Sequence, residues 1–86
     1  MIDQSEIGQW HERTFDGCSA RRVGRKLLEE SAELHCALAE HGYGDIKAVG
    51  SEIADVYIVL SAIAHRCGIN IQEEVKKKFD IVQKRY

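Results

Sequence analysis

The chain has 86 residues, which is enough for one domain, residues 1–86, and too few for two. It carries 12 Lys and Arg against 14 Asp and Glu, and a formal net charge of −2 argues against a nucleic-acid duplex as its main partner. The most apolar stretch, residues 53–64, is shorter than the roughly 20 residues of a membrane span, and the first residues do not form a targeting segment. We therefore expect a cytoplasmic protein with no membrane partner.

The cysteines do not indicate a disulfide framework or a zinc site. Cys18, Cys36 and Cys67 are odd in number, far apart and without a CxxC spacing, which predicts reduced thiols. A domain of this size buries only about 60% of its unfolded surface and is marginally stable alone. We therefore expect a homodimer or homotetramer.

Proline is absent and apolar residues recur at helical spacing, which predicts an all-α protein. The first helix is expected at about residues 5–14, followed by a loop at residues 15–18. Ser19 is a plausible N-cap for a second helix over residues 20–41, and the glycines of residues 42–44 end that helix.

Asp45 is expected to cap a third helix over residues 46–67, with Gly68 just beyond its end. Asn70 starts a fourth helix over residues 71–85, one side of which is expected to pack. The short loop between the two long helices predicts that they are antiparallel. The expected fold is a helical bundle of these two helices and two shorter ones, with a four-helix core completed by dimerisation.

Two pairs of carboxylates stand at three-residue spacing, which places each pair on one helix face: Glu30 with Glu33, and Glu52 with Asp55. The third helix is apolar on nearly every other side, which predicts that it is buried. An isolated buried anion costs several kcal/mol, so a positive group is needed there. If the long helices are antiparallel, all four carboxylates converge.

Magnesium fits such a site better than zinc, because hard cations prefer oxygen ligands and His and Cys are absent from these faces. A di-iron bundle would need Glu-x-x-His pairs, and the chain has none. Two alternatives remain from the residues alone: a solvated acidic helix face, or buried ion pairs with Lys26, Arg25 or a C-terminal lysine. Spacing and composition leave the reaction open.

The acidic residues and their context resemble the MazG-like nucleotide pyrophosphohydrolases of the all-α NTP pyrophosphatase superfamily. The family signature is EExxE and, after a spacer of variable length, ExxD; here these are residues 29–33 and residues 52–55. The flanking residues that match are Trp10, His11, Thr14, Phe15, Lys26, Leu27, Leu28, Lys78, Phe79 and Arg85. The resemblance therefore covers nearly the whole chain.

The resemblance implies a nucleoside triphosphate diphosphatase that converts a (d)NTP into the (d)NMP and pyrophosphate, with nucleotide-pool house-cleaning as one use. It implies that Mg²⁺, or Mn²⁺ as a substitute, is held by four residues: Glu30, Glu33, Glu52 and Asp55. Glu29 would support the site or orient water, and Glu30 and Lys26 would share in catalysis. Phosphate binding would fall to Lys26, Lys78 and Arg85.

Other candidates have competing explanations. Trp10 and Phe15 would either bind the base or belong to the core of the first helix. Arg21 and Arg22, and most of residues 76–78, are expected to be solvated. The histidines form no constellation and are expected at the surface or at helix ends; they are His11, His35, His41 and His65.

The base and the exact substrate are left open. Val82 stands where a purine-specific branch of the superfamily has asparagine. Phosphoribosyl-ATP pyrophosphohydrolase shares a similar acidic pattern and is an alternative activity. A non-catalytic helical dimerisation module, with its carboxylates in buried ion pairs, is an alternative from another class.

Overall fold

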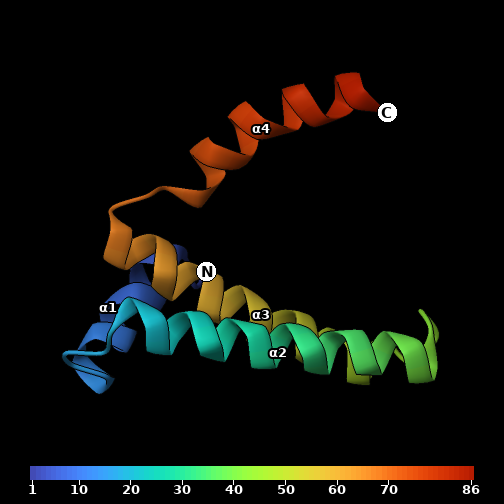
Figure 1. The fold of residues 1–86 in the computed structure, drawn as a ribbon, viewed down its shortest axis with the longest axis horizontal. Coiled ribbons are helices and arrows are strands. Elements are labelled where there is room, and N and C mark those ends of the chain that lie inside the picture. Colours follow the sequence, from blue (N-terminus) through green and yellow to red (C-terminus); the bar gives the residue numbers. More distant parts are fainter.

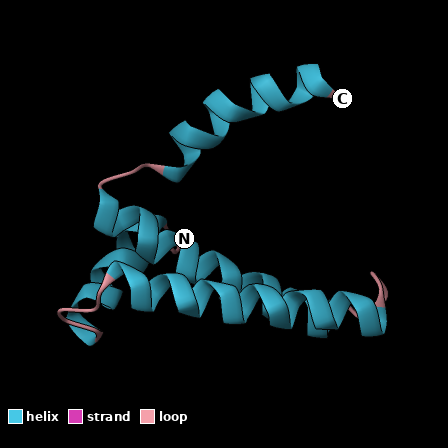
Figure 2. Cartoon of the chain, in the orientation of Figure 1, coloured by secondary structure: helices cyan, strands magenta, loops and turns pink.

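The structure, a computed structural model, describes all of residues 1–86 and consists of four α-helices without a strand. The helices, drawn in Figures 1 and 2, are α1 (Gln4–Thr14), α2 (Ala20–His41), α3 (Ile46–Cys67) and α4 (Ile71–Arg85). The predicted all-α class is confirmed, as are the bounds of the last three helices. The first helix begins one residue earlier than predicted.

Each helix begins after a residue whose side chain accepts a backbone N–H of the first turn. Such a cap satisfies one of the donors that a helix start leaves unpaired. The four capping residues are Asp3, Ser19, Asp45 and Asn70. Gly68 ends α3 with a φ of 70°, a left-handed conformation that glycine adopts without a Cβ penalty. Local side-chain chemistry therefore determines where the helices start and where α3 stops.

α2 and α3 form the predicted antiparallel hairpin, and α1 packs against α3 near the C-terminal end of that helix (Figure 1). Gly8 of α1 lies directly against His65 of α3, and a Cβ at Gly8 would overlap the histidine side chain. Arg66 and His65 then reach across to α1, where His65 contacts Glu12. The absence of a side chain at one position thus sets how closely the two helices approach.

α4 stands apart from the other helices, and the chain has the outline of an open C in Figure 1. None of its residues is buried, and Val75 and Phe79 are each more than half exposed. Its start is attached to α1 through Gln4, which bonds the carbonyl of Ile69 and accepts from the backbone N–H of Ile71. The prediction that one side of this helix packs is wrong within a single chain, because no other helix lies against it.

α3 is also less covered than its composition predicts. Ile53, Tyr57 and Leu60 are 53%, 42% and 40% exposed, whereas Val49 and Ala62 of the same helix are buried. α2 and α1 cover one side of α3 and leave the other open. The prediction that this helix is buried on nearly every side is therefore wrong for the isolated chain.

The isolated chain exposes more surface than a compact protein of its mass. Its accessible surface is 6872 Å², whereas a folded monomer of 9.7 kDa is expected to expose about 5,100 Å². The radius of gyration is 14.5 Å, against about 12 Å for a compact domain of this length. None of the helices combines the length and apolar composition needed to cross a bilayer.

Candidate metal centre and adjoining cavity

The four predicted carboxylates lie together between α2 and α3. One oxygen from each of Glu30, Glu33, Glu52 and Asp55 can be chosen so that all four atoms are within 4.8 Å of one another. The three-residue spacing puts two on one face of each helix, and the antiparallel hairpin turns the two faces toward each other. The structure thus brings together residues from distant parts of the chain as the spacing predicts.

Two carboxylate oxygens in this cluster are buried without a hydrogen-bond partner. Glu30 is only 7% exposed; its Oε1 lies 3.0 Å from Lys26 Nζ, while its Oε2 has no partner. Oε2 of Glu52 is likewise buried and unpaired. Buried polar atoms in proteins are almost always paired, and unpaired anionic oxygens are more costly still. These two oxygens are therefore acceptors suited to a cation.

The charges of the cluster shift two pKa values. The negative charge of Glu30, followed by burial and the charge of Glu52, raises the pKa of Glu33 above that of an ordinary glutamate. A hydrogen bond from Lys26 to Glu30, with the charge of that carboxylate, raises the pKa of Lys26. Glu30 is the largest cause of both shifts, through its charge at Glu33 and through its hydrogen bond at Lys26.

The chemistry of the cluster fits a hard divalent cation. All its donors are carboxylate oxygens, which magnesium and manganese accept, and no histidine or cysteine takes part. The buried unpaired oxygens of Glu30 and Glu52 supply acceptors that the protein itself leaves unused. The residues present therefore fit the ion that the sequence predicts.

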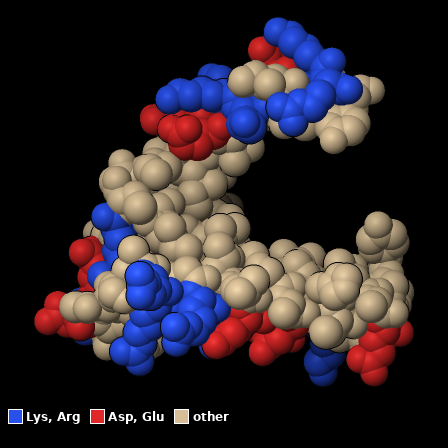
Figure 3. Space-filling model, viewed as in Figure 1, with Lys and Arg blue, Asp and Glu red and all other residues tan.

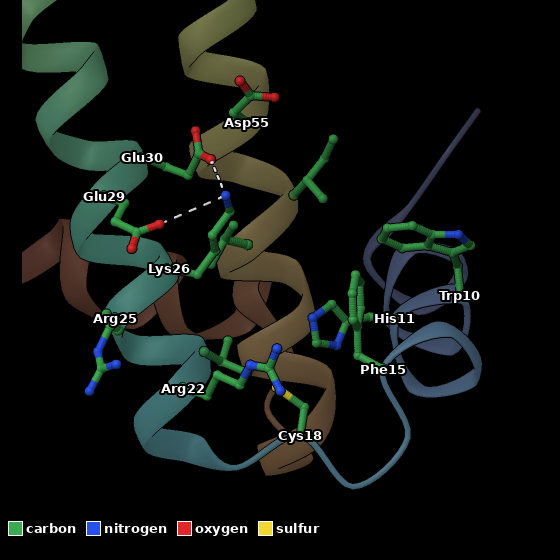
Figure 4. A pocket seen from close by; sticks show the side chains of 13 residues that line it. Trp10, His11, Phe15, Cys18, Arg22, Arg25, Lys26, Glu29, Glu30 and Asp55 are labelled. Atoms are coloured by element: carbon green, nitrogen blue, oxygen red, sulfur yellow. Dashed lines mark ion pairs between the residues drawn. The ribbon is translucent and has the colours of Figure 1, made fainter.

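A cavity of about 500 Å³ adjoins the cluster, between α1, α2 and α3. Glu29, Glu30 and Asp55 line one end of it, and Trp10 and Phe15 line the other. Figure 4 shows the aromatic side chains grouped on the α1 side, with Lys26 between them and the carboxylates. The cavity therefore joins a negatively charged end, suited to a metal ion, to an aromatic end.

The aromatic residues do not form a core. Trp10 and Phe15 are each 45% exposed, and their rings meet edge-on with centroids 5.9 Å apart. Of the two explanations for these residues, membership of the core of the first helix is wrong. Their rings instead give the cavity an apolar wall.

Two predicted phosphate-binding residues lie elsewhere. Lys78 and Arg85 belong to α4, and no residue of that helix lines the cavity. Lys26, by contrast, is at the cavity and lies 3.9 Å from Glu29 and 3.0 Å from Glu30. In its own chain, the site has one of its three predicted phosphate-binding cations.

Three basic side chains that line the cavity were not predicted as site residues: His11, Arg22 and Arg25. Arg22 and Arg25 are exposed, as expected for Arg22, but they border the cavity together with Lys26 and Glu29. The signal for the arginines is present in the sequence, since residues 22, 25, 26 and 29 fall at the steps of one helix face. No comparable signal exists for His11, whose partner is 55 residues away.

Comparison with protein-family models, with curated proteins and with solved structures finds no match for this chain. Inferences about function therefore start from the carboxylates and the cavity.

Proposed function

We propose that this protein is a magnesium-dependent nucleoside triphosphate pyrophosphohydrolase, which cleaves a (d)NTP into the (d)NMP and pyrophosphate. The observation that carries the proposal is the pair of buried, unpaired oxygens of Glu30 and Glu52 in a cluster of four carboxylates. The cluster opens on a cavity with cationic side chains along it and aromatic rings at its far end. The order of the acidic, cationic and aromatic parts matches a metal-bound triphosphate followed by a nucleoside.

The protein's own residues have separable roles in this reaction. Glu30, Glu33, Glu52 and Asp55 would hold Mg²⁺, or Mn²⁺ in its place. When bound, such a cation neutralises the carboxylates and polarises phosphoryl oxygens. Cleavage of a phosphoanhydride leaves little covalent work for the protein, so positioning and electrostatics suffice.

The cationic side chains of α2 are placed to bind the phosphates. Arg22, Arg25 and Lys26 all line the cavity, and Lys26 lies between its aromatic and acidic ends (Figure 4). Guanidinium groups bind phosphate oxygens in a bidentate manner, and lysine acts as a point charge. Glu29 is exposed at the acidic end, where it can orient a water molecule and accept its proton.

The surface that α3 and α4 leave exposed supports a homodimer, which is part of the proposal. The chain exposes about 1,700 Å² more than a compact monomer of its mass, and a stable interface needs only about 800 Å² per partner. Figure 3 shows that the α3 side of the opening carries few charged side chains, whereas α4 carries many. A second copy seated there would cover the exposed apolar residues of both helices.

A dimer would also give Lys78 and Arg85 a role. Both lie on α4, away from the cavity of their own chain. α4 carries Lys at 76, 77, 78 and 84 and Arg85, against three acidic residues. We assign Lys78 and Arg85 to the partner's acidic site, where their charge complements the carboxylates.

The test is a hydrolysis assay with canonical and modified NTPs and dNTPs, with and without Mg²⁺, in which all products are resolved. We expect monophosphate and pyrophosphate only when the metal is present. Asp55→Asn should lower turnover by about 1,000-fold or more, because metal-assisted charge stabilisation contributes several kcal/mol. Asp80→Asn is the matched control, since Asp80 is exposed and pairs only with Lys84. No turnover by the folded wild-type protein on any nucleotide would contradict the proposal, and phosphoribosyl-ATP would be the next substrate to try.

Thermal unfolding separates an enzyme from a dimerisation module. If the carboxylates bind Mg²⁺, the free energy of unfolding should rise by about 1.4 kcal/mol at ten times the Kd. The Asp55→Asn variant should lose this dependence and Asp80→Asn should keep it. A melting temperature that does not change with millimolar Mg²⁺, with or without nucleotide, would favour the dimerisation module, in which the carboxylates only form ion pairs.

A further inference from the structure

His11 lies in the wall of the cavity, and one of its ring nitrogens is already committed. Arg66 Nε donates a hydrogen bond of 3.0 Å to His11 Nδ1, and Arg66 also donates to the carbonyl oxygens of His11 and Phe15. Arginine has donors only, so Nδ1 must be an unprotonated acceptor. A neutral imidazole with a bare Nδ1 carries its proton on Nε2. The bond from Arg66 thus selects the tautomer.

The surroundings of His11 keep the ring neutral. Burial, and after it the positive charge of Arg66, lowers the pKa of His11 below its usual value of 6.5. On α3, Arg66 bonds the ring, whereas the carboxylate of Asp55 lies at the other end of the cavity. The other charged residues that line the cavity belong to α2: Arg22, Arg25, Lys26, Glu29 and Glu30. No carboxylate is bonded to the ring. His11 Nε2 is therefore a neutral N–H donor without a protein partner.

The His11 ring lies beside two other aromatic rings. The ring centroid of Phe15 is 4.9 Å from that of His11, and the Trp10 centroid is 6.2 Å away. In Figure 4 these three side chains occupy the end of the cavity opposite Glu30 and Asp55. Aromatic side chains bind bases of any identity by stacking, whereas hydrogen bonds to the base edge distinguish one base from another. The aromatic end thus combines a general surface for a base with one donor of fixed direction.

This inference rests on the proposed function. We propose that His11 selects the base, because its Nε2–H donates a hydrogen bond to an acceptor on the edge of the bound nucleobase. Arg66 is the positioning residue that fixes this donor. A base that presents an amino group at that place would bring two donors together and leave both unpaired. Such a mismatch disfavours the wrong base in a desolvated site. The ligand class is a nucleobase with a carbonyl oxygen or bare ring nitrogen facing His11.

The first experiment measures kcat/KM of wild type, His11→Phe and His11→Gln on the four common bases and on inosine triphosphate. His11→Phe keeps a ring and removes the donor, so the ratio between the best and the worst base should fall by about tenfold or more. His11→Gln can accept from Arg66 and still donate, and should keep more of the ratio than His11→Phe. An unchanged ratio in both variants, with hydrolysis intact, overturns the inference and leaves the proposed function standing. The absence of hydrolysis in wild type overturns the function instead.

A second experiment does not depend on turnover. ¹⁵N NMR should find His11 in the Nε2–H tautomer and neutral at pH 7, with its Nε2 signal shifting when nucleoside monophosphates are added. Arg66→Gln should raise the pKa of His11, mix its tautomers and reduce base discrimination in the same direction as His11→Phe. Arg21→Gln, at an exposed arginine outside the cavity, should change none of these. A wild-type His11 that is protonated on Nδ1 at pH 7, or an Nε2 signal indifferent to every nucleotide, would contradict the assignment.

Discussion

The α1–α3 body and the α4 arm are built from equally regular helices, yet they differ in what holds them. In the body, Gly8 and His65 bring α1 against α3, and Arg66 bonds the His11 side chain together with two backbone carbonyls. In the arm, every helical residue is at least partly exposed. The side-chain hydrogen bonds that link the start of the arm back to the body all come from Gln4.

The comparison shows that a helix of this chain can form without packing against another helix. α4 has an Asn70 cap, acidic residues in its first turn and basic residues in its last turn, which are the local features of a stable helix end. These features form within the arm and require no neighbour. Phe79 and Val75 gain their burial only from another surface, and a single chain offers them none. The body therefore supplies the candidate site, and the arm together with the uncovered side of α3 supplies the surface on which a second copy is expected.

The most severe test of this division is to place a charge on the apolar side of the arm. Phe79 is 57% exposed in the single chain and is expected to be buried in the dimer. Phe79→Glu should weaken self-association by about 30-fold or more, because a central aromatic residue of an interface contributes about 2 kcal/mol or more. Lys77→Glu adds an acid to the opposite side of α4 and should change association little. Sedimentation over a range of concentrations measures both, and a Phe79→Glu variant that associates like wild type would place the interface elsewhere.

A second test breaks the contact that holds the body together. Gly8→Ala puts a Cβ where the His65 side chain lies, so α1 must move away from α3. Overpacking of this kind typically costs about 1–3 kcal/mol, which outweighs the better helix propensity of alanine. We expect a lower free energy of unfolding in urea, together with loss of the Arg66 bond and therefore a higher pKa for His11. A fully stable Gly8→Ala protein would mean that α1 and α3 approach less closely than described.

The features that could be predicted from the sequence are those encoded over a few residues. Ser19, Asp45 and Asn70 predict three helix starts because a cap acts within one turn. The convergence of Glu30 with Asp55 was predictable because helical spacing and a short turn determine it together. Contacts between distant residues were not predictable: the spacing within α1 does not reveal that His11 meets Arg66, 55 residues later.

The error about α3 has the same physical origin. Its apolar residues indicate that the helix is covered, but composition does not say whether the cover comes from the same chain. Ile53 and Tyr57 remain exposed although Val49, on the same helix, is buried. A sequence reports how much surface is suited to burial, and the partner that buries it must be found in the structure or in solution.

The smallest predicted effect has the opposite sign to that of Gly8→Ala. Gly24 lies in the middle of α2, is exposed, and has open space where a Cβ would be. Alanine there removes backbone freedom from the unfolded chain and meets no neighbour, so Gly24→Ala should raise the free energy of unfolding by about 0.5–1 kcal/mol. Unfolding in urea measures the free energy of unfolding of Gly8→Ala, Gly24→Ala and wild type. Hydrolysis by Gly24→Ala should be unchanged because Gly24 does not line the cavity. Opposite signs at two helical glycines would show that close packing, and not helix propensity, explains the glycine at position 8. Destabilisation by both would instead mean that α2 is covered at Gly24 in the assembled protein, which would extend the dimer interface from α3 and α4 onto α2.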